Sequence, residues 1–266
     1  FTGIGSIKTQ SPSAGSATKK LWKNLLRKKS QSRKNRRMFF QIIETSSAGN
    51  SAFLSFHGRN ILIDAGVGIR KIDAYLKGRG ASRADIDAIF VTHEHIDHCR
   101  ALKSFRGCRA KIFANRCTAE AIRSSEPSTK ALDWAVFESG DAFKFGEFCV
   151  SSFPTPHDSS DSVGYCFDCS NKRLVWMTDL GKVTFVARDF AKSANVLVLE
   201  SNYCPRMLDN SSRPYSLKTR IKGSHGHLSN ADAIELLKSI DCGVSEKIYL
   251  AHISRECNSV SHIRDL

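Results

Sequence analysis

The stretch VTHEHIDHCR, residues 91–100, places four side chains of metal-binding types within six positions: His93, His95, Asp97 and His98. The apolar run IDAIFV (86–91) comes directly before it and is typical of a buried strand. The pattern is not the zincin motif H-E-x-x-H, because Asp97 stands where that motif has its second histidine. Glu94 is therefore not predicted to be a metalloprotease base.

Three other predicted strands also lead into histidine or aspartate: 148–153 into His157, 173–178 into Asp179 and 247–251 into His252. Loops at the edge of a rigid sheet are where functional sites are commonly built. Imidazole and carboxylate groups suit Zn²⁺, Mn²⁺ or Fe. A surface or helix-capping role would explain any one of these residues, but it does not explain the whole set. The pattern predicts a metal site.

The chain from Met38 onward alternates short apolar runs with loops and helical stretches. Strands are predicted at 39–43, 52–56, 60–64, 86–91, 110–114, 148–153, 163–167, 173–178, 195–200 and 247–251. Helices are predicted at about 68–78, 97–106, 116–125 and 230–240, with N-terminal box signals at Ser82 with Asp85 and at Ser229 with Asp232. This mixture predicts an α/β or α+β sandwich in which helices cover sheets.

The composition is that of an ordinary globular protein, with 41% apolar and 25% charged residues in a chain of 266. No apolar run reaches the roughly 18 to 20 residues of a membrane helix, so stable membrane insertion is not expected. No secretory signal is recognised. The nine cysteines form no disulfide framework, which favours reduced thiols in a cytosol-like compartment. The C-x-x-C pair Cys166 and Cys169 is expected in a strand rather than in a zinc knuckle.

The positive charge gathers at the N-terminus. Residues 1–37 hold eleven Lys or Arg and no acid, which leaves +3 of the net +14 for residues 38–266. We therefore expect a basic, disordered arm before one folded domain. Three interpretations of the arm remain open: a nucleic-acid or membrane-surface arm, an organelle transit peptide, or a dispensable tail.

The motif THEHIDH resembles the signature of the metallo-β-lactamase superfamily, and ILIDAG, PTPHD, TDLG and LAHIS resemble its other motifs. The resemblance runs from about Met38 to the C-terminus and implies a four-layer αββα sandwich with two divalent metal ions at one edge. It implies the following roles: His93, His95 and His157 hold one ion, Asp97, His98 and His252 hold the other, Asp179 bridges the two, and Asp64 braces the motif loop without binding metal.

A finer resemblance is to the YycJ/WalJ-like branch, through SSAGNSAFL (46–54), LESNY (199–203), PYSLKTRIKGSHGHLSN (214–230) and LAHISRECN (250–258). Members of that branch resemble DNA exonucleases and are associated with the bacterial cytoplasm. The family pattern continues past the last histidine with ENN and a further helix and strand. Here that place reads ECN and the sequence stops at Leu266, so we expect a shortened C-terminus or a fragment.

Substrate contacts are predicted mainly in GSHGHLSN. His227 is expected to contact phosphate or act as a general acid, and the helix N-terminus at Ser229 offers backbone N–H groups to a phosphate. His225 and Asn50 are weaker candidates, with loop-lining and turn roles as the alternatives. Lys218, Arg220 and Lys222 alternate along one possible strand and could follow a nucleic-acid backbone, although solvated charge is the better explanation of any one of them.

Two ions about 3.5–4 Å apart could activate a water, oriented by Asp97 and Asp179, for in-line hydrolysis of a phosphodiester. The first hypothesis is therefore a DNA exonuclease that contacts the DNA backbone and binds more weakly as salt rises. The second is another hydrolase of this fold: an RNA nuclease, cyclic-nucleotide phosphodiesterase, thioesterase or lactonase. The third is a non-catalytic nucleic-acid-binding protein with structural metal, whose usual sign, eroded ligands, is missing here.

Overall fold

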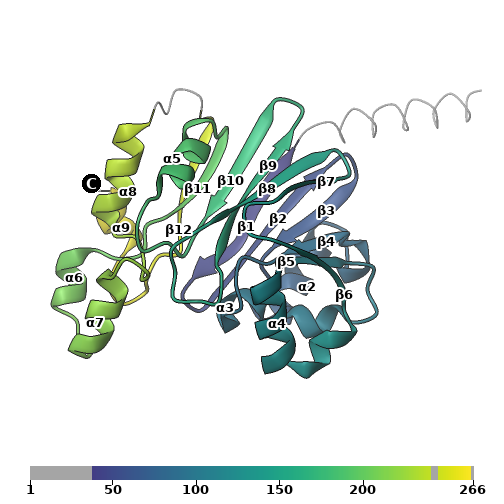
Figure 1. Ribbon diagram of the computed structural model, residues 1–266, viewed down its shortest axis with the longest axis horizontal. Coiled ribbons are helices and arrows are strands. Elements are labelled where there is room, and N and C mark those ends of the chain that lie inside the picture. The colour runs from purple at the N-terminus through teal and green to yellow at the C-terminus, as the bar shows by residue number, and fades with distance from the viewer. Residues whose placement is uncertain (1–37, 241–244, 265–266) are drawn as a thin grey trace, which may run out of the picture. The chain divides into compact units, whose positions relative to one another are not determined.

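The computed structural model describes residues 38–240 and 245–264, and the predicted arm at 1–37 lies outside them. The described strands form two sheets of six (Figure 1). The first sheet has the order β1 (Phe39–Ser46), β2 (Gly49–Phe56), β3 (Arg59–Ile63), β4 (Ala88–Phe90), β5 (Lys111–Asn115), β6 (Asp133–Phe137). The second has the order β12 (Lys247–Ala251), β11 (Val196–Glu200), β10 (Lys172–Met177), β9 (Val163–Cys169), β8 (Phe148–Pro154), β7 (Ala142–Phe145).

The described helices are α2 (Ile69–Gly78), α3 (Ile96–Cys99), α4 (Arg116–Ser125), α5 (Phe185–Lys192), α6 (Pro205–Asp209), α7 (Tyr215–Lys222), α8 (Asn230–Ser239) and α9 (Val260–Arg264). Short 3₁₀ helices are η1 (Arg83–Asp85), η2 (Leu102–Phe105) and η3 (Pro127–Ala131). Asp85 accepts hydrogen bonds from Ser82 at the start of η1, and Ser229 caps α8. Both predicted box signals therefore mark real helix starts, the first of them only a 3₁₀ turn.

Three apolar cores define four layers. The two sheets face each other across a core rich in aromatic rings, including Phe90, Phe167 and Trp176. The outer face of the first sheet packs on α2 and α4, and the outer face of the second packs on α5 and α8. Figure 1 shows these helices on opposite sides of the paired sheets. The predicted four-layer αββα sandwich is confirmed.

Strand direction brings distant loops to one edge of the sandwich. Strands β3 to β6 run parallel in the first sheet, and β10 to β12 run parallel in the second. Strand β8 is antiparallel to β9, which is antiparallel to β10, so β8 and β10 point the same way. The loops that follow β4, β8, β10, β11 and β12 carry the predicted site residues except Asp64, which follows β3, and Asn50, which lies in β2.

Two predicted elements differ from the structure. The helix predicted at 97–106 stops after one turn, because the backbone N–H of Ala101 donates to Ala65 O at 2.8 Å instead of continuing the helix. The strand predicted through Lys218 and Lys222 is wrong, because this segment is helix α7. Leu217 and Ile221, four residues apart, share the buried side of that helix.

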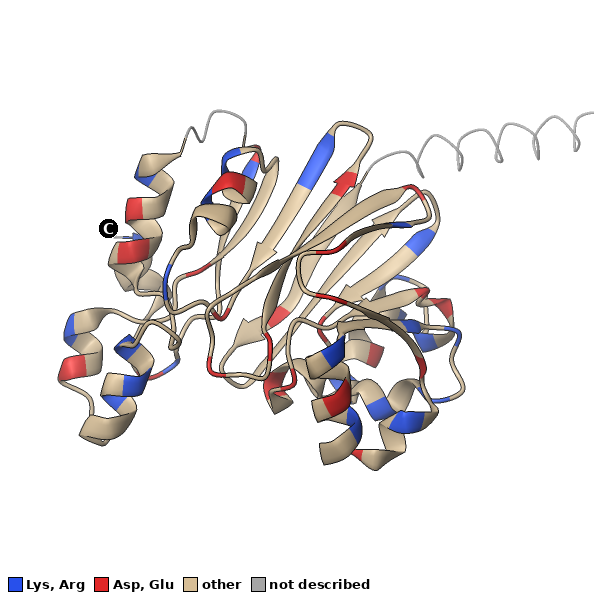
Figure 2. Ribbon diagram, in the orientation of Figure 1, with Lys and Arg blue, Asp and Glu red and all other residues tan. Residues whose placement is uncertain are grey.

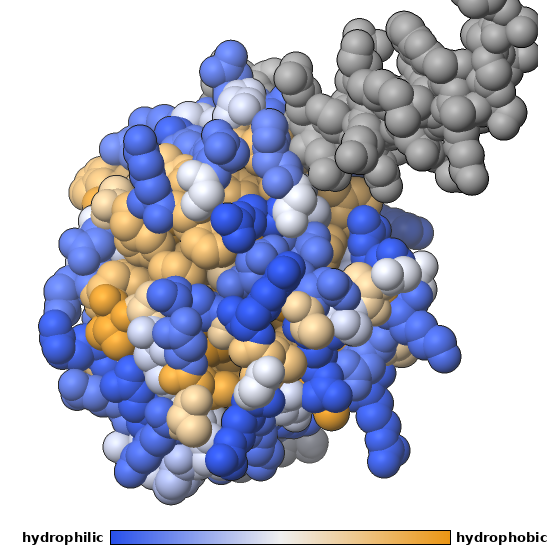
Figure 3. Space-filling view, turned by 90° about the vertical axis from the view of Figure 1, so that its right-hand side faces the viewer, coloured by the Kyte–Doolittle hydropathy of each residue, from blue (hydrophilic) through white to orange (hydrophobic). Residues whose placement is uncertain are grey.

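Lys, Arg, Asp and Glu residues are frequent along the helices, including α7 (Figure 2). The face seen after a 90° turn is mainly hydrophilic, with apolar areas between the charged side chains (Figure 3). Among the described residues, no helix is both long enough and apolar enough to cross a membrane.

Candidate metal centre

Asp64 holds the loop of the histidine motif, residues 92–98, in place through hydrogen bonds. It follows β3, is fully buried, and accepts hydrogen bonds from the backbone N–H of Thr92 at 2.8 Å and from Thr92 Oγ1 at 3.1 Å. Its other oxygen lies 2.8 Å from His98 Nδ1. Burial raises the pKa of Asp64, while the charge and hydrogen bond of His98 act in the opposite direction. These contacts fix the ring of His98, as expected of a residue that braces the loop.

The backbone of this region is packed without spare space. A Cβ atom on Gly66 would lie 1.5 Å from the carbonyl oxygen of Asp97, so only glycine lets the two loops meet. Asp64, Asp179 and His252 all have left-handed backbone angles, with φ of 58°, 58° and 55°. Such angles are unfavourable for these residues and are commonly found at functional sites. The fold therefore imposes the positions of these side chains.

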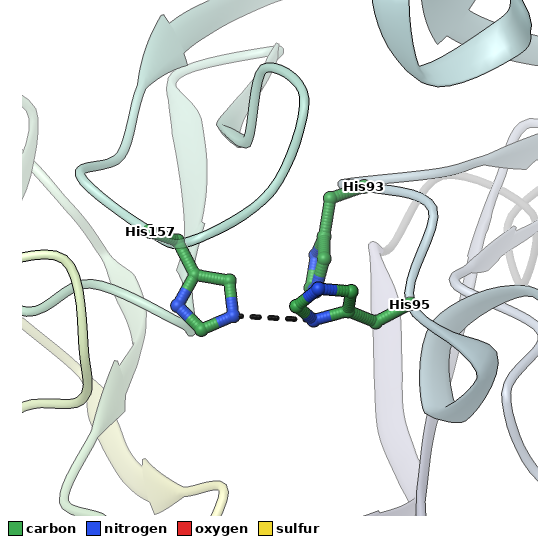
Figure 4. A group of neighbouring side chains, drawn as sticks. All are labelled: His93, His95 and His157. Carbon is green, nitrogen blue, oxygen red and sulfur yellow. Dashed lines mark hydrogen bonds between the residues drawn. The ribbon is translucent and has the colours of Figure 1, made fainter. Parts of the chain in front are cut away.

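The first cluster consists of His93, His95 and His157, whose ligand atoms lie within 4.8 Å of one another. Figure 4 shows the three rings converging from two loops, with His157 Nε2 3.3 Å from His95 Nδ1. Two of the rings are oriented through their Nδ1 atoms. His157 Nδ1 lies 3.0 Å from Gly226 O, and His93 Nδ1 lies 3.0 Å from Thr92 Oγ1. Of their Nε2 atoms, that of His93 has no partner in the described structure and that of His157 faces His95, the third member of the cluster.

The second cluster consists of Asp97, His98 and His252, again with ligand atoms within 4.8 Å of one another. Asp179 lies between the clusters. Its Oδ2 is 3.3 Å from His98 Nε2, and its Oδ1 is 3.8 Å from His157 Nε2. Asp179 is thus the one carboxylate of the predicted ligand set that reaches histidines of both clusters, which is the position expected of a bridging ligand.

Glu200 is a member of the site that the sequence reasoning missed. It ends β11, is fully buried, and its Oε1 lies 2.8 Å from both His227 Nδ1 and His252 Nδ1. Its Oε2 accepts the backbone N–H groups of Leu180 at 2.9 Å and Leu228 at 3.1 Å. The signal was available, because 195–200 also ends in an acid at the same sheet edge as the other ligand strands.

Electrostatics divide the site into two halves. Burial lowers the pKa of His93 well below its usual value, and neighbouring imidazoles add to the effect, so His93 is neutral. Burial would also lower the pKa of His252, but Asp179, Asp97 and Glu200 outweigh it and raise the value to about 10. The carboxylates around His252 therefore make this half of the site favourable for a positive charge.

The residues fit a metal centre. Three buried atoms of the site have no hydrogen-bond partner in the described structure: His93 Nε2, His252 Nε2 and Asp179 Oδ2. Buried polar atoms are almost always paired, so three orphaned atoms at one place indicate a missing ligand. Neutral imidazole and carboxylate are the donors that Zn²⁺, Mn²⁺ and Fe accept. Two clusters joined by a carboxylate suit two ions.

The residues predicted to contact substrate do not all line the same cleft. His227 lines the cleft above the clusters. His225 is exposed and borders a different hollow, where its Nδ1 lies 3.1 Å from Ser224 Oγ. Ser229 is buried and caps α8, so its hydroxyl serves Asp232. Asn50 is fully buried, with its amide nitrogen 3.0 Å from His98 Nε2 and its oxygen accepting from the β1–β2 turn.

Two backbone N–H groups at the helix N-terminus predicted to receive a phosphate already have protein partners. The backbone N–H of Leu228 donates to Glu200, and that of Asp232 donates to Ser229 Oγ. Instead, the cleft is bordered by side chains that the sequence reasoning gave no site role or placed on a strand, namely Asn202, Arg213 and Arg220. Sequence alone could not find them, because their place depends on how 201–222 folds across the site.

Comparison with known proteins agrees with this geometry. Residues 59–253 match the family model described as "Beta-lactamase superfamily domain". The chain is 31% identical to Exodeoxyribonuclease YycJ of Bacillus anthracis over 222 residues, which cover 83% of this chain and 84% of that protein. It is 32% identical to Exodeoxyribonuclease WalJ of Streptococcus pneumoniae serotype 2 (strain D39 / NCTC 7466) over 222 residues, 82% of each.

Among solved structures, the metallo-β-lactamase fold protein YhfI from Bacillus subtilis superposes with a TM-score of 0.67 at 15% identity, covering 86% of this chain and 91% of that chain. At this identity the likeness concerns the fold alone. The family match and the two relatives confirm what the histidine motif and its companions predicted. This chain belongs to the metallo-β-lactamase superfamily, in the branch of YycJ and WalJ.

Proposed function

We propose that this protein is a metal-dependent phosphodiesterase that degrades DNA from an end, with residues 38–266 as its catalytic domain. The observation that carries the proposal is the pair of His/Asp clusters joined by Asp179, with orphaned ligand atoms, at the bottom of a cleft. The relatives named exodeoxyribonucleases support DNA as the substrate. The described cysteines are free thiols, which supports a reducing compartment such as a bacterial cytoplasm.

The proposed ligands are those implied by the motifs: His93, His95 and His157 for one ion, Asp97, His98 and His252 for the second, and Asp179 for both. Divalent ions held there would stabilise the charge that develops on the phosphoryl group and lower the pKa of water. Asp97 and Asp179 accept hydrogen bonds and so orient the attacking water.

His227 is proposed to protonate the leaving oxygen. Its Nδ1 is held by Glu200 at 2.8 Å, so Nδ1 keeps its proton and Nε2 faces the substrate. The imidazolium form carries a second proton on Nε2, and this is the proton given to the leaving oxygen, which leaves the neutral ring with its proton on Nδ1. Its ring is 5.0 Å from that of His157 and 5.2 Å from that of His252, between the two clusters. A residue placed there can reach an oxygen that leaves the reacting phosphate.

The first test uses linear DNA labelled at either the 5′ or the 3′ end, a closed circular DNA of the same sequence, and added Mn²⁺ or Zn²⁺. We expect stepwise loss from one end of the linear DNA and no attack on the circle. Asp179→Ala should abolish the loss while its circular dichroism spectrum stays native. A folded, metal-loaded wild-type protein that leaves linear DNA intact would overturn DNA as the substrate, and RNA and small esters would be tested next.

The role of His227 has its own signature. His227→Ala should slow DNA hydrolysis by about 10²- to 10⁴-fold, the usual contribution of a general acid. It should slow hydrolysis of a p-nitrophenyl phosphodiester much less, because p-nitrophenolate leaves without a proton. His225→Ala is the matched control, since it removes an exposed imidazole outside the cleft. Equal slowing of both substrates by His227→Ala would contradict the proton-transfer role.

A further inference from the structure

The cleft above the clusters is small, and its outer wall comes from the segment between β11 and α8. This segment contains α6 and α7, and it contributes Arg213, Leu217, Arg220 and Ile221 to the lining. The cleft has a volume of about 220 Å³. Pockets that enclose a whole small-molecule ligand have roughly 300–1,000 Å³. The cleft therefore suits one phosphodiester linkage, and the rest of a nucleic-acid strand has to be held at its rim.

The two arginines at this rim are only loosely committed to protein partners. Arg213 donates through Nε to Glu256 Oε2 at 3.0 Å, and Arg220 donates through Nε to Asp158. One partner of each pair is well exposed, Glu256 at 48% and Arg220 at 62%, while Arg213 and Asp158 keep 25% and 28% of their side-chain surface exposed. Exposed ion pairs of this kind contribute little to stability, so a phosphate can join or replace the carboxylate at low cost.

The hydrogen bonds that both guanidinium groups make to described residues come from Nε. The two terminal nitrogens of each keep their N–H donors for a ligand. A planar guanidinium binds phosphate through two parallel hydrogen bonds, which makes arginine the usual residue for this task. Both groups thus have the chemistry and the place required to hold phosphates beside the reacting one.

The lysines of the same helix have a different role. Lys218 donates to the carbonyl oxygens of Asp209 and Ser211 at 2.8 Å and 2.7 Å, and Lys222 pairs with the carboxylate of Asp209. Neither borders the cleft. These bonds hold α7 against the end of α6. The basic residues of α7 (Figure 2) therefore fall into two groups, the lysines that bind this neighbouring segment and Arg220 that borders the cleft.

We propose that Arg213 and Arg220 bind the backbone phosphates that flank the scissile linkage of a DNA strand and so position it over the clusters. The inference rests on the proposed function, because it names the part of the molecule that holds the same substrate. In this proposal the arginines hold the flanking phosphates and not the reacting one, so both act on binding rather than on the chemical step.

The test compares Arg213→Gln, Arg220→Gln and the double variant with Lys222→Gln, which makes the same charge change away from the cleft and on the helix that carries Arg220. Binding of a fluorescent single-stranded oligonucleotide is followed by anisotropy without added metal, in the Asp179→Ala background. Each arginine variant should weaken binding about tenfold and reduce the slope of log K against log salt by about 0.7. Lys222→Gln should leave both quantities at the parent value.

Kinetics on the metal-loaded protein provide the second measurement. KM for DNA should rise in the arginine variants with kcat nearly constant, and hydrolysis of bis(p-nitrophenyl) phosphate, which lacks flanking phosphates, should be unchanged. Unaltered binding and salt slope in the double variant would refute the inference even if wild type degrades DNA. Arginine-dependent binding without any DNA cleavage by wild type would keep the inference and refute the exonuclease instead.

Discussion

Glu200→Gln offers the sharpest test of how this site is held together. Glu200 accepts four hydrogen bonds, from two imidazoles at Oε1 and from two backbone N–H groups at Oε2. Glutamine keeps the shape but can accept on one side only. The backbone N–H groups of Leu180 and Leu228 cannot become acceptors, so the amide oxygen has to face them. The amide NH₂ then faces His227 and His252.

That arrangement changes the protonation of both rings. An NH₂ donor at Nδ1 requires Nδ1 to accept, so the proton of the neutral ring moves to Nε2. In His252, Nε2 is the orphaned atom proposed to bind metal, and a protonated nitrogen cannot do so. Loss of such a supporting contact costs about 10- to 100-fold in metal affinity, equal to roughly 1.4–2.7 kcal/mol.

The effect on the free energy of unfolding is of similar size and can be measured separately from the effect on metal affinity. Two backbone hydrogen bonds change from a charged to a neutral acceptor, at a cost of about 1 kcal/mol each. We expect the metal-free variant to lose about 2 kcal/mol of unfolding free energy in urea. Metal content and chelator competition should show weakened binding of one ion and retention of the other.

Glu246→Gln is the matched control, because Glu246 is an exposed acid paired with Lys172. It should change neither metal affinity nor unfolding free energy measurably. If Glu200→Gln binds both ions with wild-type affinity, the argument from ring protonation is wrong and Glu200 has only a packing role.

Three further outcomes are expected. Gly66→Ala should lower the free energy of unfolding in urea by at least about 1–3 kcal/mol and weaken metal binding, because its Cβ would overlap the Asp97 carbonyl. Gly68→Ala is the control, since a Cβ there has nothing within 4 Å and should change neither quantity. Equal behaviour of the two variants would contradict the close contact between Gly66 and Asp97. Chelation should lower the thermal midpoint, since ions at about 1,000 times their Kd contribute about 4 kcal/mol; an unchanged midpoint in EDTA for a protein shown to lose its metal would argue against the clusters as the binding site. Tyr165→Phe should cost about 1–3 kcal/mol, because it leaves the buried Val91 carbonyl without the hydroxyl that donates to it at 2.7 Å, and a neutral effect in urea titration would show that this bond adds nothing.

The sequence predicted the fold where one physical signal dominated. The inner strands were recognisable because they are short apolar runs bounded by turns, and their burial on both faces explains why. Strands β6 and β7 were missed, since they lie at sheet edges and contain exposed and half-buried residues in place of a continuous apolar run. Helix α7 was misread because the spacing of Lys218, Arg220 and Lys222 imitates a strand, while the Leu217–Ile221 pair carried the helical period.

The site residues, too, were predicted where a local sequence signal marked them and missed where it did not. The proposed metal ligands were found because each stands directly after a predicted strand, and parallel strands bring their ends together. Glu200 was overlooked although it occupies an equivalent strand end. Arg213 and Arg220 belong to a segment whose path across the cleft depends on tertiary packing of Leu217 and Ile221 against Tyr203 and Leu208. No local pattern contains that information.

The division of the ligands between the two sheets has a consequence for the order of folding. His93, His95, Asp97 and His98 follow a strand of the first sheet, whereas His157, Asp179 and His252 follow strands of the second. Neither half of the chain alone offers all the ligands proposed for either ion. An ion can bind ligands from both sheets only after the two sheets have packed together. It would therefore slow unfolding far more than it would speed folding. Metal would then act on the unfolding rate, and a protein stripped of it would open along the plane between the sheets.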